Sequence, residues 1–186
     1  MSERMPPKPP RLTKPVVLVG MMGAGKSAVG LALSRLLEVE FLDSDEALVE
    51  AANMSIAEIF ERDGEAFFRK RETEVIDRLL TGAPAIVSTG GGAFMAERNR
   101  ALISAKGVSL WLKADLELLW NRVKHKTTRP LLQTDDPRAT LGEIFAARDP
   151  IYAQADLFVE AREAYSIEEM AQAVCTRLIE AGIVET

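Results

Sequence analysis

The sequence has little of what builds disulfide or metal frameworks. Its 186 residues include one cysteine and one histidine, so an internal disulfide is excluded, and a lone histidine gives no metal cluster. Cys175 falls in an apolar helical pattern, which favours a buried, inert thiol. These absences fit the reducing cytoplasm, where we expect the protein to work.

Long apolar runs and an excess of positive charge are also missing. No apolar run approaches the roughly 18 residues of a membrane span. The formal net charge of -5 argues against a broad basic face that binds nucleic acid. Residues 1–14 contain no apolar segment of a secretory signal, and we expect them to form a flexible tail. The remaining residues, 15–186, suit a single domain without membrane or nucleic-acid partners.

What the sequence does contain is a phosphate-binding loop. An apolar run at 15–19 leads into Gly-Met-Met-Gly-Ala-Gly-Lys-Ser at 20–27, which has the G-x-x-x-x-G-K-S pattern. Its glycines let backbone N–H groups converge on phosphate oxygens at the start of a helix. Lys26 would reach the β- and γ-phosphates of a nucleotide, and the Ser27 hydroxyl would complete the coordination of Mg²⁺. An ordinary strand-to-helix turn is the weaker alternative.

Apolar and helical patterns alternate along the rest of the chain. Apolar runs predict strands at 15–19, 83–88, 108–112 and 156–159, and a further short strand at 40–42 is too short to be assigned from periodicity alone. Helical patterns lie between them, beginning with an amphipathic stripe that includes Leu36. Such alternation predicts a parallel sheet covered by helices on both faces, with ligands bound at the carboxyl ends of its strands.

Two segments depart from this alternation. Residues 45–80 read as helical throughout, with a capping box at 55–58 and a break at Asp63-Gly64, so they resemble an insertion between strands. Residues 124–137 show little apolar periodicity. They predict an exposed, mobile loop that would act as a lid.

Asp43 and Asp45 form a carboxylate pair just after the second strand. On an extended chain both side chains would point the same way. One would hold Mg²⁺ while the other accepts a proton from a substrate hydroxyl that attacks the γ-phosphate. The alternative is that Asp45 merely caps the following helix. The next strand along the chain ends in Ser88, where many phosphate-loop enzymes place an aspartate, so the pair remains the best candidate.

Three further features have both a functional and a structural interpretation. Gly90 to Gly92 leave a strand end without side chains, either for close approach of a ligand or as a simple turn. Arg69 could bind an anion or only pair with Glu72, and Arg148 could bind an anion or only complement a helix end. Arg129, in the predicted lid, could neutralise the transferring phosphoryl group.

Taken together, these motifs resemble those of the shikimate kinase family, over nearly the whole chain from about residue 15. The matching sequences are Gly-Met-Met-Gly-Ala-Gly-Lys-Ser (20–27), Phe-Leu-Asp-Ser-Asp (41–45), Phe-Arg-Lys-Arg-Glu (68–72), Thr-Gly-Gly-Gly (89–92), Arg-Pro-Leu-Leu (129–132), and Arg148 with Tyr152. The resemblance implies a three-layer α/β/α fold like that of nucleoside monophosphate kinases, with a central five-stranded parallel sheet. It also implies a shikimate-binding helical insertion at 43–80 and a lid at 124–137.

The resemblance implies transfer of the γ-phosphoryl group of ATP to the 3-hydroxyl of shikimate, in the chorismate pathway to aromatic amino acids. Shikimate would be bound by Asp45, Arg69, Gly91 and Arg148, with the arginines on its carboxylate. ATP would be bound by Gly23, Ala24, Gly25, Lys26, Ser27, Ala28, Arg122 and Arg129, with Arg122 near adenine. One Mg²⁺ ion would accompany ATP at Ser27 and Asp43. The catalytic residues would be Lys26, Asp45 and Arg129. We expect the enzyme to be a monomer.

The chain departs from the family pattern at two places. Ala28 stands where the family usually has threonine, and the loop 161–165, expected near adenine, has no clear match. Two other functions remain open. A kinase acting on gluconate or a nucleoside monophosphate is disfavoured by the set of acceptor residues, and a regulatory nucleotide-binding module is disfavoured because Lys26, Asp45 and Arg129 are all present.

Overall fold

The computed structural model describes residues 8–126 and 130–186, and its centre is a parallel sheet of five strands. The strands are β2 (Val16–Val19), β3 (Phe41–Asp43), β4 (Ile86–Ser88), β5 (Val108–Lys113) and β6 (Leu157–Glu160), in the spatial order β3-β4-β2-β5-β6. All four neighbouring pairs are parallel. The predicted fold class, a parallel five-stranded sheet between helices, is confirmed.

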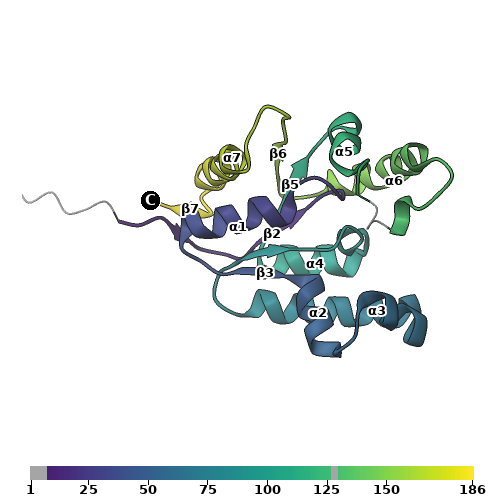
Figure 1. The fold of residues 1–186 in the computed structure, drawn as a ribbon. Helices are drawn as coiled ribbons and strands as arrows, with labels where there is room; N and C mark the ends of the chain where they lie inside the picture. Colours follow the sequence, from purple (N-terminus) through teal and green to yellow (C-terminus); the bar gives the residue numbers. More distant parts are fainter. Residues whose placement is uncertain (1–7, 127–129) are drawn as a thin grey trace, which may run out of the picture.

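Helices cover the two faces of this sheet (Figure 1). They are α1 (Lys26–Leu37), α2 (Ser44–Ala52), α3 (Ile56–Thr81), α4 (Glu97–Lys106), α5 (Leu116–Val123), α6 (Pro137–Tyr152) and α7 (Ile167–Glu180), with short 3-10 turns η1 (Ala93–Met95) and η2 (Pro130–Leu132). Helix α1 packs against α7, whereas α3 packs against α4. No helix within the described ranges is long and apolar enough to cross a membrane.

The apolar side chains form a large core and a small satellite. The large core is centred on β2, whose four residues are all buried, as expected for an inner strand of a parallel sheet. The satellite consists of Leu48, Ile59, Phe68 and Val75, which pack between α2 and α3. Helices α2 and α3 therefore hold together partly through apolar contacts of their own.

Local sequence signals set most helix boundaries. The predicted capping box is present at Ser55 and Glu58, where each side chain bonds to the other residue's backbone N–H. Gly64 breaks α3 with φ 82° and ψ 173°, a backbone conformation that residues with side chains rarely adopt. Helix α3 therefore consists of two segments, as the Asp63-Gly64 break predicted.

The structure differs from the sequence-based expectations near the N-terminus. Part of the predicted flexible tail forms strand β1 (Arg11–Leu12), which pairs antiparallel with β7 (Val184–Glu185). Leu12 is only 5% exposed, and both strands are too short, and too far apart in sequence, to show a pattern. Leu36, placed in the buried stripe of α1, is 42% exposed, because the stripe is narrower than predicted. Residues 1–7 lie outside the described part.

The predicted lid is described only in part. Residues 127–129, Arg129 among them, lie outside the described ranges. The segment that follows is not wholly exposed, since Leu132 of η2 is buried against the large core. Leu132 therefore attaches this part of the loop to the domain through apolar contacts. The action of residues 124–137 as a lid stays a prediction.

Two helical glycines give a matched test of packing. A Cβ atom added at Gly30 in α1 would lie 2.6 Å from a ring carbon of Phe41, whereas one at Gly142 in α6 would meet only Leu116, at 3.7 Å. We expect Gly30→Ala to lower the free energy of unfolding by about 1 to 3 kcal/mol through overpacking. Gly142→Ala should raise it by up to about 1 kcal/mol through helix propensity. Urea denaturation of both variants checks this, and equal effects of one sign would contradict it.

Candidate active site

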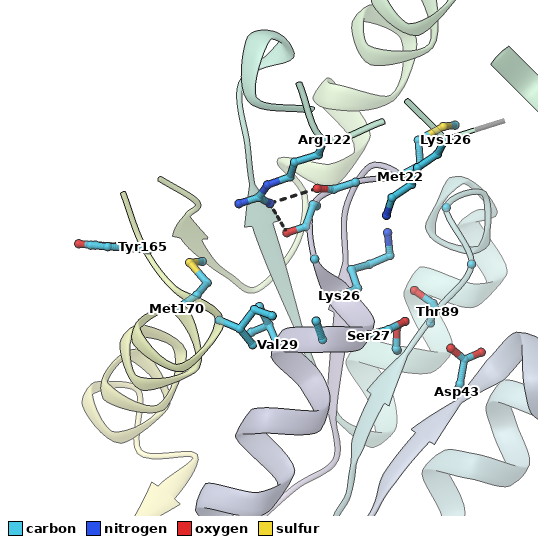
Figure 2. A pocket seen from close by; sticks show the side chains of 18 of the residues that line it. Met22, Lys26, Ser27, Val29, Asp43, Thr89, Arg122, Lys126, Tyr165 and Met170 are labelled. Carbon is cyan, nitrogen blue, oxygen red and sulfur yellow. Dashed lines mark hydrogen bonds between the residues drawn. The ribbon is translucent and has the colours of Figure 1, made fainter. Parts of the chain in front are cut away.

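The phosphate loop lies at the carboxyl end of β2, against a cavity of about 570 Å³. Gly23 and Gly25 have φ angles of 83° and 94°, in the left-handed region. At Gly23 a side chain would also collide with Val123, because a Cβ atom there would lie 2.8 Å from the valine Cγ1. Residues 22–27 of the loop line this cavity, and Figure 2 labels three of them, Met22, Lys26 and Ser27. Both glycines are therefore required by the turn itself.

Two cations brace this loop through its carbonyl groups. Lys26 Nζ donates to the carbonyl oxygens of Gly20 (2.7 Å) and Met21 (3.0 Å). Arg122, from α5, donates to the carbonyl oxygens of Gly23 (3.1 Å) and Ala24 (3.2 Å), as the dashed lines in Figure 2 show. No local sequence pattern predicts this second contact, since Arg122 is 98 residues or more from its partners. Its predicted position near adenine stays a prediction.

The two aspartates lie at the end of β3 and the start of α2. Asp43, not Asp45, caps α2, because its Oδ1 accepts from the backbone N–H groups of Asp45 (2.9 Å) and Glu46 (3.1 Å). The expectation of an extended chain through Asp45 was wrong, since α2 begins at Ser44. Even so, both carboxylates line the cavity of the phosphate loop. Helix geometry, rather than strand alternation, brings them together.

The surroundings of Asp45 favour its protonated form. Its pKa is raised from 3.8 to about 6, mainly by burial and also by the nearby carboxylates of Asp43 and Glu72, while the charges of Lys26 and Arg69 act in the opposite direction. A carboxyl group with such a pKa is partly ionised near neutral pH, so it can accept a proton and later release it.

The turn at residues 90–92 explains how the acceptor residues converge. A Cβ atom at Gly90 would lie 2.8 Å from Asp45 Oδ1, one at Gly91 would lie 3.0 Å from Arg148 Nη1, and one at Gly92 would lie 2.7 Å from Arg69 Nη2. Three successive glycines therefore each face one of the predicted acceptor residues. These three polar groups fill the space that side chains at residues 90–92 would need. From the sequence, we had expected this space to admit a ligand instead.

A second cavity, of about 560 Å³, opens on the other side of this turn. Both arginines predicted to bind the acceptor, Arg69 and Arg148, line this cavity. The full lining consists of Glu65, Arg69, Gly92, Met95, Ala96, Glu97, Arg98 and Arg148. The predicted pair of Arg69 with Glu72 is present, with 2.9 Å between Nη1 and Oε1. It does not belong to a solvated face, because Glu72 is 2% exposed. Arg69 is thus oriented by a buried carboxylate while its guanidinium borders the cavity.

Glu72 is a residue whose importance the sequence did not reveal. Burial raises its pKa, and the Arg69 guanidinium opposes this shift through a hydrogen bond and its charge. A buried carboxylate without such a partner would cost several kcal/mol. The acid and Arg69 therefore depend on each other, and the sequence indicated this only through their i, i+3 spacing and the family match at 68–72.

The loop at 161–165 was left without assigned contacts by the sequence. In the structure, Arg162 and Tyr165 line the first cavity, and Met170 of α7 lies beside them (Figure 2). Ala28 lines the same cavity. Tyr165 and Met170 lie at the end of the cavity away from Asp43 and Thr89. Their positions fit a flat, partly apolar group such as a nucleotide base.

Comparison with known proteins points to a single family. The family model described as "Shikimate kinase" matches residues 22–179. The chain is 62% identical over 171 residues to a shikimate kinase of Cereibacter sphaeroides, covering 90% of this chain and 85% of that protein.

Solved structures agree with this match. A shikimate kinase from Acinetobacter baumannii, in complex with shikimate, superposes with a TM-score of 0.83 at 35% identity, over 90% of this chain and 94% of that one. A gluconokinase from Sinorhizobium meliloti 1021 has a TM-score of 0.64 at 18% identity, over 92% and 94% of the two chains, and so shares the fold alone. The family model and the relatives that are 35% and 62% identical agree on one family, and this chain therefore belongs to the shikimate kinase family.

Proposed function

We propose that the protein transfers the γ-phosphoryl group of ATP to the 3-hydroxyl of shikimate, which gives shikimate 3-phosphate and ADP. The observation that carries this proposal is the turn at residues 90–92. Its three glycines face Asp45, Arg148 and Arg69 in succession, and Asp45 also lines the cavity of the phosphate loop. A proton acceptor therefore lies between a phosphate site and a pair of arginines suited to a carboxylate.

On the nucleotide side, the loop residues 23–28 would hold the phosphates through backbone N–H groups and the first turn of α1. Lys26 would exchange its two carbonyl contacts for the β- and γ-phosphates. Arg122 would keep the loop in shape while its exposed side borders the base. We also place Arg129 at the transferring phosphoryl group, on the strength of its match to the family motif at 129–132.

The residues at the loop fit one Mg²⁺ ion that accompanies ATP. Mg²⁺ in kinases binds one or two protein oxygens together with the substrate phosphates. Figure 2 shows the Ser27 hydroxyl on the side of the cavity where Asp43 lies. Asp43 uses Oδ1 to cap α2, so Oδ2 is the oxygen it would offer. When bound, the ion would neutralise charge on the phosphate oxygens.

On the acceptor side, Arg69 and Arg148 would bind the shikimate carboxylate, with the Gly91 backbone beside it. Charge-assisted hydrogen bonds of this kind contribute about 1.5 to 3 kcal/mol each, enough to select an acid. Asp45 would accept the proton of the 3-hydroxyl as its oxygen attacks the γ-phosphate. Its raised pKa suits this role, since a base near pH 7 needs neither a very low nor a very high proton affinity.

We further propose that residues 15–186 work as one kinase domain, with 43–80 as the shikimate-binding insertion and 124–137 as the lid. The need for ATP and the single buried Cys175 support a cytoplasmic location. We also propose that the enzyme works as a monomer. Light scattering after size-exclusion chromatography tests the oligomeric state.

The reaction is tested by ADP release from the purified protein with MgATP and shikimate, quinate or gluconate. We expect a strong rise with shikimate alone, because the arginine pair and Asp45 must both be engaged. A rise with gluconate alone would support the alternative that the protein is a gluconate kinase, whose fold it shares. No rise with any acceptor, in protein that binds ATP, would contradict the kinase assignment.

Substitution of Arg69 tests the acceptor side. We expect Arg69→Ala to raise the KM for shikimate about 10- to 100-fold through loss of a charge-assisted hydrogen bond, and to leave the KM for ATP nearly unchanged. Arg69→Lys, which keeps a positive charge beside Glu72, should show a smaller rise. Arg71→Ala is the matched control, since Arg71 pairs with Glu74 on another face of α3. Equal losses for both substrates would contradict the assignment.

The pKa of Asp45 predicts a pH profile. Above about pH 6 its carboxylate is ionised and can accept a proton, and below that it is protonated and cannot. We expect kcat/KM for shikimate, measured at saturating MgATP, to fall as the pH decreases through about 6, with the slope of a single proton. A profile that stays flat down to about pH 5 would show that Asp45 is not the required base.

Asp45 should also lower the stability of the free protein. In the unfolded chain its pKa has the ordinary value of 3.8, and in the folded chain it is about 6. Between these values the folded protein holds a proton that the unfolded chain releases, so this group's contribution to the free energy of unfolding decreases as the pH rises. At pH well above 6, Asp45→Asn should therefore stabilise the fold by about 1 to 2 kcal/mol while abolishing activity.

The same substitution measured near pH 4 is the control. There the Asp45 carboxyl is protonated in the folded state, so the gain in thermal stability should nearly vanish. A gain of equal size at both pH values would show that ionisation of Asp45 is not its cause.

A further inference from the structure

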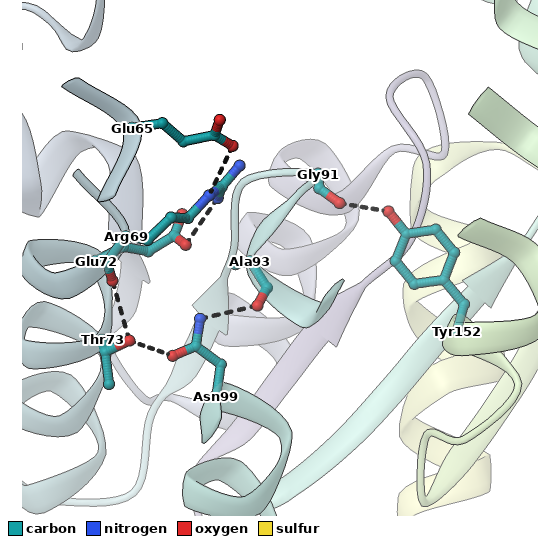
Figure 3. Close-up of polar contacts among 8 residues, drawn as sticks. All are labelled: Glu65, Arg69, Glu72, Thr73, Gly91, Ala93, Asn99 and Tyr152. Carbon is teal, nitrogen blue, oxygen red and sulfur yellow. Dashed lines mark hydrogen bonds and ion pairs between the residues drawn. The ribbon is translucent and has the colours of Figure 1, made fainter. Parts of the chain in front are cut away.

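The glycine turn at 90–92 is held from two sides by buried hydrogen bonds. On one side, Asn99 Nδ2 donates to the carbonyl oxygen of Ala93 at 2.8 Å. On the other, the Tyr152 hydroxyl donates to the carbonyl oxygen of Gly91 at 2.6 Å. Figure 3 shows the turn suspended between these two contacts. Its position is therefore fixed by residues from α4 and α6 rather than by the turn alone.

Each of these contacts leads to a helix that carries one of the two arginines. Tyr152 lies one turn after Arg148 on α6, and burial raises the pKa of the Tyr152 hydroxyl while the positive charge of Arg148 opposes that rise. Thr73 lies one turn after Arg69 on α3, and its hydroxyl donates to Asn99 Oδ1 at 2.7 Å. A spacing of four residues places both members of each pair on one side of their helix. On each helix, therefore, a residue one turn after the arginine connects that helix to the glycine turn, Tyr152 directly and Thr73 through Asn99.

The linking side chains are buried and lie behind the site. Asn99 is 0% exposed and Tyr152 is 1% exposed, and neither they nor Thr73 line the two cavities. The Asn99 amide is satisfied at both ends, by Thr73 and by Ala93. A buried polar network that is fully paired favours one arrangement, because any shift leaves a polar atom without a partner.

We infer that Asn99 and Tyr152 are positioning residues that set the spacing of Arg69 and Arg148 across the glycine turn. The adjacent glycines 91 and 92 each lie against one of these guanidinium groups, so the turn fixes how far apart they stand. A carboxylate is recognised by both arginines only if that spacing is kept. The inference rests on the proposed function, in which this arginine pair reads the shikimate carboxylate.

The test uses substitutions that remove the hydrogen-bonding group of one side chain and keep its shape. Tyr152→Phe keeps the ring against Phe94 and Trp111, and Thr73→Val keeps the branched side chain. Asn99→Leu removes the whole link, and the first two variants keep the test decisive if it fails to fold. Ser109→Ala is the control, because Ser109 is buried and hydrogen-bonded to Asp156 near the opposite end of β5.

The measurements are KM for shikimate, KM for ATP, melting temperature, and the preference for shikimate over its methyl ester, which keeps the hydroxyls but lacks the charge. We expect Tyr152→Phe and Thr73→Val each to raise the KM for shikimate about tenfold and to reduce the preference for the acid, because a small misplacement weakens oriented contacts. The KM for ATP should hardly change. Ser109→Ala should lose stability with both substrate constants unchanged.

Different failures point to different errors. If the wild-type protein does not phosphorylate shikimate, the proposed function is wrong and this inference falls with it. If the wild-type protein is active but the variants lose only melting temperature, as Ser109→Ala does, then Asn99 and Tyr152 are structural and the inference alone is overturned. A parallel rise in the KM of both substrates would also overturn it.

Discussion

The acceptor side of the site depends on a steric constraint, which is that the backbone at residues 90–92 has no room for side chains. Polar atoms of Asp45, Arg148 and Arg69 lie 2.8, 3.0 and 2.7 Å from the positions that Cβ atoms would take. Because these three residues come from three different helices, no local segment could place them together. A bare stretch of backbone at the carboxyl end of β4 gives all three a common surface to lie against, and the phosphate loop at the end of β2 lies next to it in the sheet.

The charges around Asp45 lower the stability of the fold but suit this residue to accept a proton. The carboxylates of Asp43 and Glu72 disfavour the charged form of Asp45, whereas the nearby cations Lys26 and Arg69 favour it. Folding therefore tolerates a group that resists ionisation, which is common where a residue must take up a proton. The same cations have other partners, since Lys26 contacts loop carbonyls and Arg69 pairs with Glu72. Binding an anion would thus redistribute contacts that already exist.

The sequence predicted the parts of this structure that have local signals. The phosphate loop, the strands of the sheet and the capping box at Ser55 each depend on a sequence pattern only a few residues long. The pairing of β1 with β7, the contact from Arg122 to the loop and the network through Asn99 join residues far apart in the chain, and no single-sequence pattern reports them. That Asp43 rather than Asp45 caps α2 has another cause. The helix begins at Ser44, whereas strand alternation assumed an extended chain through Asp45.

The small satellite core between α2 and α3 has a consequence for how the molecule opens. Its four buried side chains stand apart from the large core of the sheet, and Gly64 interrupts the backbone beside them. Local opening here exposes far less apolar area than separation of the sheet, so it costs less free energy. Amide hydrogens of α2 and of the first segment of α3 would therefore exchange with solvent sooner than those of β2. An acid bound at Arg69 would slow that exchange only if it joins the second segment of α3 to the rest of the domain.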